Sequence, residues 1–150
     1  MSSTRKIKRP WGVTLLCVAV LIVAGMNLAR LAQAVREWQY LEKLLPISPA
    51  YLAVTGLVWG ALGLLAAWRM GQGQPWARWF GLAYIVAFSA YYWIDRLFLP
   101  GYPGRNSNWA FSAGLNLFLI VWSVFTLIQP KAKQFFEANN DRRVKNSTTA

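Results

Sequence analysis

Four long apolar blocks constrain the fold more than any other feature of this sequence. They run from Trp11 to Ala29, from Tyr51 to Trp68, from Trp76 to Leu99 and from Trp109 to Ile128. Each block is long enough for a helix to cross about 30 Å of hydrocarbon, and none alternates with the period of two that marks a strand. Because a chain in hydrocarbon must satisfy its backbone hydrogen bonds internally, the blocks predict an all-α, integral membrane protein that folds as a four-helix transmembrane bundle.

The charges of the chain support a membrane partner. Hydrophobic residues make up 56% of the sequence and charged residues 14%, whereas soluble domains have about 25% charged residues. The net charge of +11 resembles that of a nucleic-acid-binding protein, but most of the cations lie outside the apolar blocks. We therefore expect the partner to be a lipid bilayer with anionic headgroups, and we expect no nucleic acid.

The segments between and after the blocks divide the chain. From Arg30 to Leu45, apolar residues recur near helical spacing among charged ones, which predicts a short amphipathic helix after the first span. Such a helix either lies on the membrane surface or packs on the bundle as an ordinary loop helix. Residues 1–130 are expected to form a single four-span transmembrane domain. Residues 131–150 are expected to form a basic, largely disordered cytoplasmic tail.

The distribution of Lys and Arg predicts the orientation. Of the 16 cations, eleven lie before the first block, in or next to the connection between the second and third blocks, or after the fourth. The other five lie in or next to the two remaining connections. The richer side faces the cytoplasm, so the prediction is a multi-pass protein of the cell membrane with both termini cytoplasmic. An alternative for the first block is a cleaved signal peptide ending at Ala32-Gln33-Ala34, although the apolar run exceeds the usual length of about 7–15 residues.

The second block carries a stripe of small side chains. At about 100° per residue its members share one sector of the helix, where another helix backbone can approach closely. The partner is either another span of this chain, another membrane subunit or a second copy in a homo-oligomer. The helix-packing residues are Ala53, Gly56, Gly60, Gly63 and Ala67.

The third block has an aromatic face, which we expect to turn inward. Arg78 and Arg96 project from the opposite side and are expected to reach the two headgroup layers from the lipid side. The face is either ordinary packing or a slot for a flat apolar ligand or a lipid tail. Its residues are Phe80, Tyr84, Phe88 and Tyr91.

Polar residues within the blocks concentrate in the outer half of the predicted bundle. They are interpreted either as interhelical hydrogen bonds or as a small polar cavity that opens outward. Asp95 is the only acid in the four blocks, and Arg30 is its predicted ion-pair partner. The candidate polar cluster consists of Asn27, Arg30, Thr55, Ser89, Asp95 and Asn116.

The sequence is poor in groups that perform chemistry. It has no histidine, one cysteine and five acidic residues, and no phosphate loop or metal-ligand spacing. We therefore expect no cofactor and no metal, and a non-enzymatic protein: an accessory, assembly or scaffolding subunit that acts through helix–helix contacts. The alternative is a binder or carrier of a small or lipid-like ligand, which would use the polar cluster and the aromatic face.

The orientation can be tested by cysteine labelling. In a Cys17→Ser background, we expect a single cysteine near Arg105 to react with an impermeant maleimide added outside the cell. A cysteine near Gly73 should react only after the membrane is permeabilised, because the cation-rich connections remain inside. The reverse pattern of labelling would overturn the orientation.

Overall fold

The protein is all-α. The computed structural model describes residues 10–44, 47–98 and 108–137, and these residues form six helices and no strand. Five of them are α1 (Trp11–Arg36), α2 (Trp38–Leu44), α3 (Pro49–Gly71), α4 (Pro75–Phe98) and α5 (Trp109–Ile128). A sixth, short helix covers residues 130–137. The N-terminal cations before Pro10, the third connection around Arg105 and the tail after residue 137 lie outside the described residues.

Three helices are long and apolar enough to cross a membrane. They are α1, α3 and α5, with 26, 23 and 20 residues. The fourth predicted span, α4, is 24 residues long, or about 36 Å at 1.5 Å per residue, but it is not one of these three. Charged residues near its ends and several tyrosines and tryptophans make α4 less apolar than the other long helices.

Local sequence signals determine where the helices begin and end. The side chain of Ser48 accepts a hydrogen bond from the backbone N–H of Ala50 at 3.3 Å, and Pro49 occupies the first turn of α3. Between α3 and α4, Gly73 has a φ of 67°, a left-handed conformation that favours glycine. This turn reverses the chain and sets α4 beside α3.

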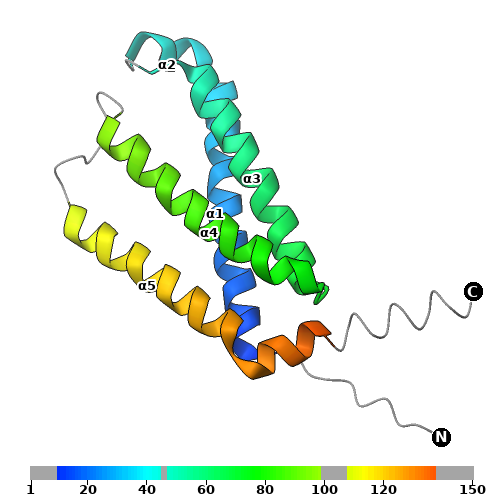
Figure 1. The fold of residues 1–150 in the computed structure, drawn as a ribbon. Coiled ribbons are helices and arrows are strands. Elements are labelled where there is room, and N and C mark those ends of the chain that lie inside the picture. The colour runs from blue at the N-terminus through cyan, green and yellow to red at the C-terminus, as the bar shows by residue number, and fades with distance from the viewer. Residues whose placement is uncertain (1–9, 45–46, 99–107, 138–150) are drawn as a thin grey trace, which may run out of the picture.

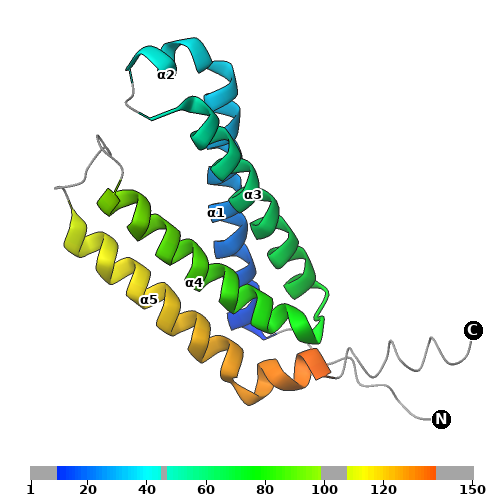
Figure 2. The same cartoon turned by 45° about the horizontal axis from the view of Figure 1, so that its top comes forward.

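The four long helices alternate in direction and form two pairs. Figures 1 and 2 show α1 beside α3 and α4 beside α5. The pairs approach each other where α1 begins and α5 ends, and they separate toward the opposite end, which carries α2. We call these the closed end and the open end of the bundle. Because α3 and α5 run in the same direction, α4 carries the chain back along the full length of the bundle.

The apolar core lies at the closed end. Side chains from all four long helices meet there, and Phe135 and Phe136 of the 130–137 helix complete the cluster. The start of the predicted tail is therefore helical and packed, with Phe136 only 2% exposed. The cluster consists of Val13, Leu16, Cys17, Met70, Ala77, Leu127, Ala132, Phe135 and Phe136.

The small residues of α3 pack against α1 of the same chain, and this is the most extensive helix contact among the described residues. A Cβ atom built on Gly56 would lie 2.7 Å from the backbone carbonyl oxygen of Asn27. A Cβ on Gly63 would lie 2.8 Å from the Cβ of Ala24. These distances are shorter than van der Waals contact, so the absence of a side chain permits the approach of the two helices.

The segment after α1 is a separate short helix. The last turn of α1 closes with the N–H of Glu37 donating to the carbonyl of Gln33 at 2.9 Å, and α2 starts at the next residue. Trp38 and Tyr40 of α2 are 39% and 65% exposed. A short helix therefore follows the first span, but it begins at Trp38 and not at Arg30 as predicted, because the residues up to Arg36 continue α1.

The close approach of α1 and α3 generates a test. Gly56→Ala should lower the free energy of unfolding by about 1–3 kcal/mol, because the new methyl group meets backbone that cannot rotate away. Gly114→Ala is the matched control, since no atom of the described residues lies within 4 Å of the added Cβ. Its stability should be equal to that of the wild type or slightly higher. Thermal unfolding in detergent measures both, and equal stability of the two variants would contradict the close packing of α1 on α3.

Candidate functional site

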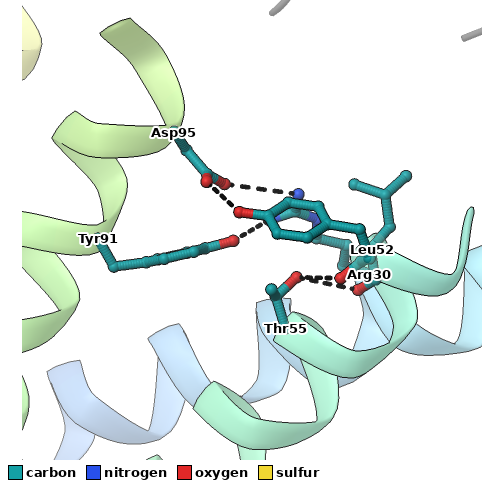
Figure 3. A network of polar contacts seen from close by, with 6 residues as sticks. Arg30, Leu52, Thr55, Tyr91 and Asp95 are labelled. Carbon is teal, nitrogen blue, oxygen red and sulfur yellow. Dashed lines mark hydrogen bonds and ion pairs between the residues drawn. The ribbon is translucent and has the colours of Figure 1, made fainter. Parts of the chain in front are cut away.

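A buried carboxylate holds three helices together near the open end. Asp95 of α4 is 3% exposed and accepts a short hydrogen bond from the hydroxyl of Tyr51, at the start of α3. Its second carboxylate oxygen lies 3.9 Å from a guanidinium nitrogen of Arg30 on α1. Figure 3 shows Asp95 pointing toward Arg30 from the opposite side of the gap between their helices. The ion pair predicted from the sequence is present in the structure.

Arg30 is held loosely in this network. Besides its 3.9 Å approach to Asp95, it donates a hydrogen bond of 3.4 Å to the hydroxyl of Tyr91 (Figure 3). Both distances are long for charge-assisted contacts, which typically lie near 2.7–2.9 Å. Asp95 therefore has two partners on other helices: Tyr51, which donates a hydrogen bond to it, and Arg30, which contributes a longer electrostatic contact.

Two members of the predicted polar cluster bond within their own helices. The hydroxyl of Thr55 donates to the backbone carbonyl of Tyr51 at 2.7 Å. The side-chain amide of Asn27 donates to the carbonyl of Val23 at 2.8 Å. These bonds satisfy the donors locally, so neither residue is required to connect helices.

A second polar contact set connects α4 and α5. The hydroxyl of Ser89 donates to the side-chain oxygen of Asn116 at 3.0 Å. One turn or more closer to the open end, Arg96 donates to the hydroxyls of Tyr92 at 2.8 Å and Ser112 at 3.2 Å. Of the six predicted polar residues, Arg30 and Asp95 therefore form one contact and Ser89 and Asn116 another. Asn27 and Thr55 bond within their own helices.

The predicted lipid exposure of Arg96 is wrong. Its side chain faces α5, and the residue is only 5% exposed. The error arose because the prediction gave α4 one buried face, whereas α4 lies between α3 and α5 and buries both sides. Arg78, by contrast, is half-buried, and its guanidinium carbon lies 5.2 Å from the centre of the Trp79 ring.

The aromatic face of α4 packs on a tryptophan of α3. The ring centre of Trp59 lies 5.8 Å from that of Tyr84, 5.4 Å from that of Phe88 and 5.1 Å from that of Tyr91. The Tyr84 hydroxyl also donates to the backbone carbonyl of Trp59 at 3.1 Å. Phe80 lies one turn closer to the closed end, half-buried. This arrangement favours the interpretation of the face as helix packing.

A cleft of about 550 Å³ lies between α1 on one side and α4 and α5 on the other. This volume is in the range of about 300–1,000 Å³ that is typical of small-molecule sites. Toward the closed end its walls are apolar, with Leu16, Ala19, Val20, Ile85 and Leu119. Toward the open end they become polar, with Asn27, Arg30, Ser89, Tyr92, Ser112 and Asn116.

The change from apolar to polar lining runs in the same direction on all three helices. On α1 it occurs between Val20 and Arg30, and on α4 between Ile85 and Tyr92. On α5, which runs the opposite way, the polar residue Ser112 precedes Leu119. The lined part of α1, from Leu16 to Arg30, extends about 21 Å. The cleft thus offers an apolar channel that ends in polar groups.

The sequence pattern indicates four of the cleft's polar residues but not the role of Tyr51 and Tyr92. Both tyrosines lie near block ends, where aromatic residues are typical of an interfacial belt. Their hydroxyls are partners of Asp95 and Arg96 instead. For Tyr92 the signal is Arg96, a charge one turn away on the same helix that requires a polar partner when it is buried. Tyr51 is separated from Asp95 by 44 positions in the sequence, so no local pattern identifies it.

The described part of the chain holds no candidate metal centre. Among the described residues, no group of three His, Cys, Asp or Glu side chains is arranged to hold a metal ion. Comparison with models of known protein families, with curated proteins and with solved structures finds no match to this chain. The features that bear on function are therefore the cleft and the two polar contact sets.

The network around Asp95 can be tested with double-mutant cycles. Asp95→Asn and Tyr51→Phe should be coupled by about 1 kcal/mol, because each removes the same short hydrogen bond. Asp95→Asn and Arg30→Gln should show a smaller coupling, since their charges are 3.9 Å apart. Unfolding in detergent measures both cycles. Additive effects for the Tyr51 pair would show that the short bond does not hold α3 to α4.

Proposed function

We propose that the chain crosses the membrane four times, with α4 as the fourth span and both termini cytoplasmic. The alternating directions of the helices support this topology. Both α3 and α5 are long and apolar enough to span, and they run the same way, so the chain must return across the bilayer between them. Among the described residues, α4 is the helix that lies between them in sequence, and two of the polar side chains that make it less apolar, Asp95 and Arg96, are buried against its neighbours.

We further propose that the protein binds a lipid-like amphiphile in the cleft between α1 and the α4–α5 pair. The observation that carries this proposal is the graded lining, apolar toward the closed end and polar toward the open end. An amphiphile has the same gradient along its own length, so its tail and headgroup match the two parts of the cleft. Under the proposed topology, the polar end of the cleft lies at the level of the outer headgroups.

A scaffolding role, acting on another subunit, is the alternative. Its main support in the sequence is the small-residue stripe on α3, where a partner helix could pack. That surface is occupied by α1 of the same chain. The stripe therefore gives no reason to expect an external partner, whereas the cleft offers room for a ligand. Co-purification of a second membrane protein in place of lipid would favour the scaffolding role.

Filling the apolar part of the cleft tests the binding proposal. Native mass spectrometry of the purified protein, supplied with equal amounts of phosphatidylglycerol and phosphatidylcholine, should detect retained lipid on the wild type. Ala19→Phe places a ring in the apolar part of the cleft and should reduce total lipid retention about tenfold or more. The reason is that the ring and the acyl chain cannot occupy the same space.

The matched control is Ala83→Phe. Ala83 is exposed on α4 and does not line the cleft, so the same increase in side-chain volume leaves the cleft open. We expect wild-type lipid retention for this variant. Equal retention by both variants, or no retained lipid on the wild type, would overturn the proposal.

A further inference from the structure

We infer that the ligand of this cleft is a phospholipid with a net negative headgroup, and that Arg30 binds its phosphate. The inference rests on the proposed function, because it names the class of amphiphile that the cleft selects. Three features carry it: the charge of the lining, the weak contacts of Arg30, and the hydrogen-bonding groups beside it.

Within the part of the chain that the structure describes, Arg30 is the only charged residue that lines the cleft. The other polar lining residues are neutral, and Asp95 lies behind Arg30, buried and outside the lining. Arg96 lies outside the lining but donates to the hydroxyls of Tyr92 and Ser112, so the polar end of the cleft is positive, with Arg30 as the charged side chain that a ligand can contact directly. A headgroup with a net negative charge complements this surface, whereas a zwitterionic headgroup brings a second cation close to Arg30.

The network around Asp95 leaves Arg30 able to bind an anion. Tyr51 donates the short hydrogen bond to Asp95, so the carboxylate does not depend on Arg30 alone for compensation. The two contacts of Arg30 are long, at 3.9 Å to Asp95 and 3.4 Å to Tyr91. Its side chain is 32% exposed, and a guanidinium has five N–H donors. A phosphate can therefore form bidentate hydrogen bonds with Arg30 at a small cost in existing contacts.

Neutral polar groups surround the same position. Asn27 lies about one turn along α1 from Arg30, and Ser89 and Asn116 contact each other on the facing wall. The side-chain amides of Asn27 and Asn116 each give one N–H to a backbone carbonyl and have a second N–H, which can donate to phosphate or glycerol oxygens without adding charge. The apolar walls below them, about 15 Å from Leu16 to Met26 along α1, receive an acyl chain.

The test compares two headgroups on identical acyl chains. Native mass spectrometry with equimolar phosphatidylglycerol and phosphatidylcholine should show about a tenfold preference of the wild type for phosphatidylglycerol. Arg30→Gln should bring the ratio of retained phosphatidylglycerol to retained phosphatidylcholine close to one. Arg30→Lys should keep part of the preference because the charge remains. Asp95→Asn should raise the ratio, since it removes the anion that competes with the headgroup for Arg30.

The control for nonspecific attraction is Arg36→Gln. Arg36 lies further along α1, is exposed and does not line the cleft, so its loss should leave the ratio at the wild-type value. Equal retention of both lipids by the wild type would overturn the headgroup inference and leave the proposed lipid binding intact. Retention of neither lipid would overturn the proposed function itself. An equal fall of the ratio in Arg36→Gln and Arg30→Gln would assign the preference to surface charge and contradict a site at Arg30.

Discussion

The close crossing of α1 and α3 is the contact on which the rest of the structure depends. Gly56 of α3 lets the two backbones approach to a distance that a Cβ atom would prevent, and Gly60 and Gly63 leave room for the side chains of Leu28 and Ala24 of α1. In hydrocarbon there is no hydrophobic driving force between helices, so such close contact is a principal source of association. The α1–α3 pair is thus the base on which the less intimate α4–α5 pair packs.

The α4–α5 pair packs on α1 and α3 through different kinds of contact at its two ends. At the closed end it shares an apolar core with α1 and α3, to which the 130–137 helix adds two phenylalanines. Toward the open end the helices diverge. Long side chains connect them there. Trp59 and the aromatic face of α4 fill the middle of the gap, and Tyr51 reaches Asp95 near its end. The cleft between α1 and α4–α5 is a consequence of this divergence.

The helices can be predicted well from the sequence because hydrophobic length is a local property. The predicted blocks differ from α1, α3, α4 and α5 by a few residues at most at each end, except that α1 continues to Arg36. The stripe on α3 could also be identified, since small residues gathered in one sector of a helix are typical of a close helix crossing. The sequence does not identify the helix that packs against this stripe, because the face of one helix does not specify which helix covers it.

The side-chain partners were harder to predict because they depend on how α4 is placed between two neighbours. Asp95 and Arg96 are adjacent and therefore point about 100° apart, which the sequence shows. Whether the side chain of Arg96 faces lipid or α5 depends on tertiary packing. The prediction of lipid exposure for Arg96 was wrong for this reason. The first residues of the predicted tail illustrate the same limit. Phe135 and Phe136 are apolar enough to be buried, but the core that receives them is formed by helices distant in sequence.

The choice of partner for Asp95 decides what the open end can do. A buried carboxylate needs compensation, and either a cation or a hydroxyl donor can supply part of it. If Arg30 formed a close bidentate pair with Asp95, the two charges would cancel and the lining of the cleft would be electrically neutral. Because Tyr51 donates the short bond, Asp95 is stabilised from α3 while Arg30 remains at 3.9 Å, on the side of the cleft. The same hydrogen bond therefore joins α3 to α4 and leaves the guanidinium on α1 available to an anionic ligand.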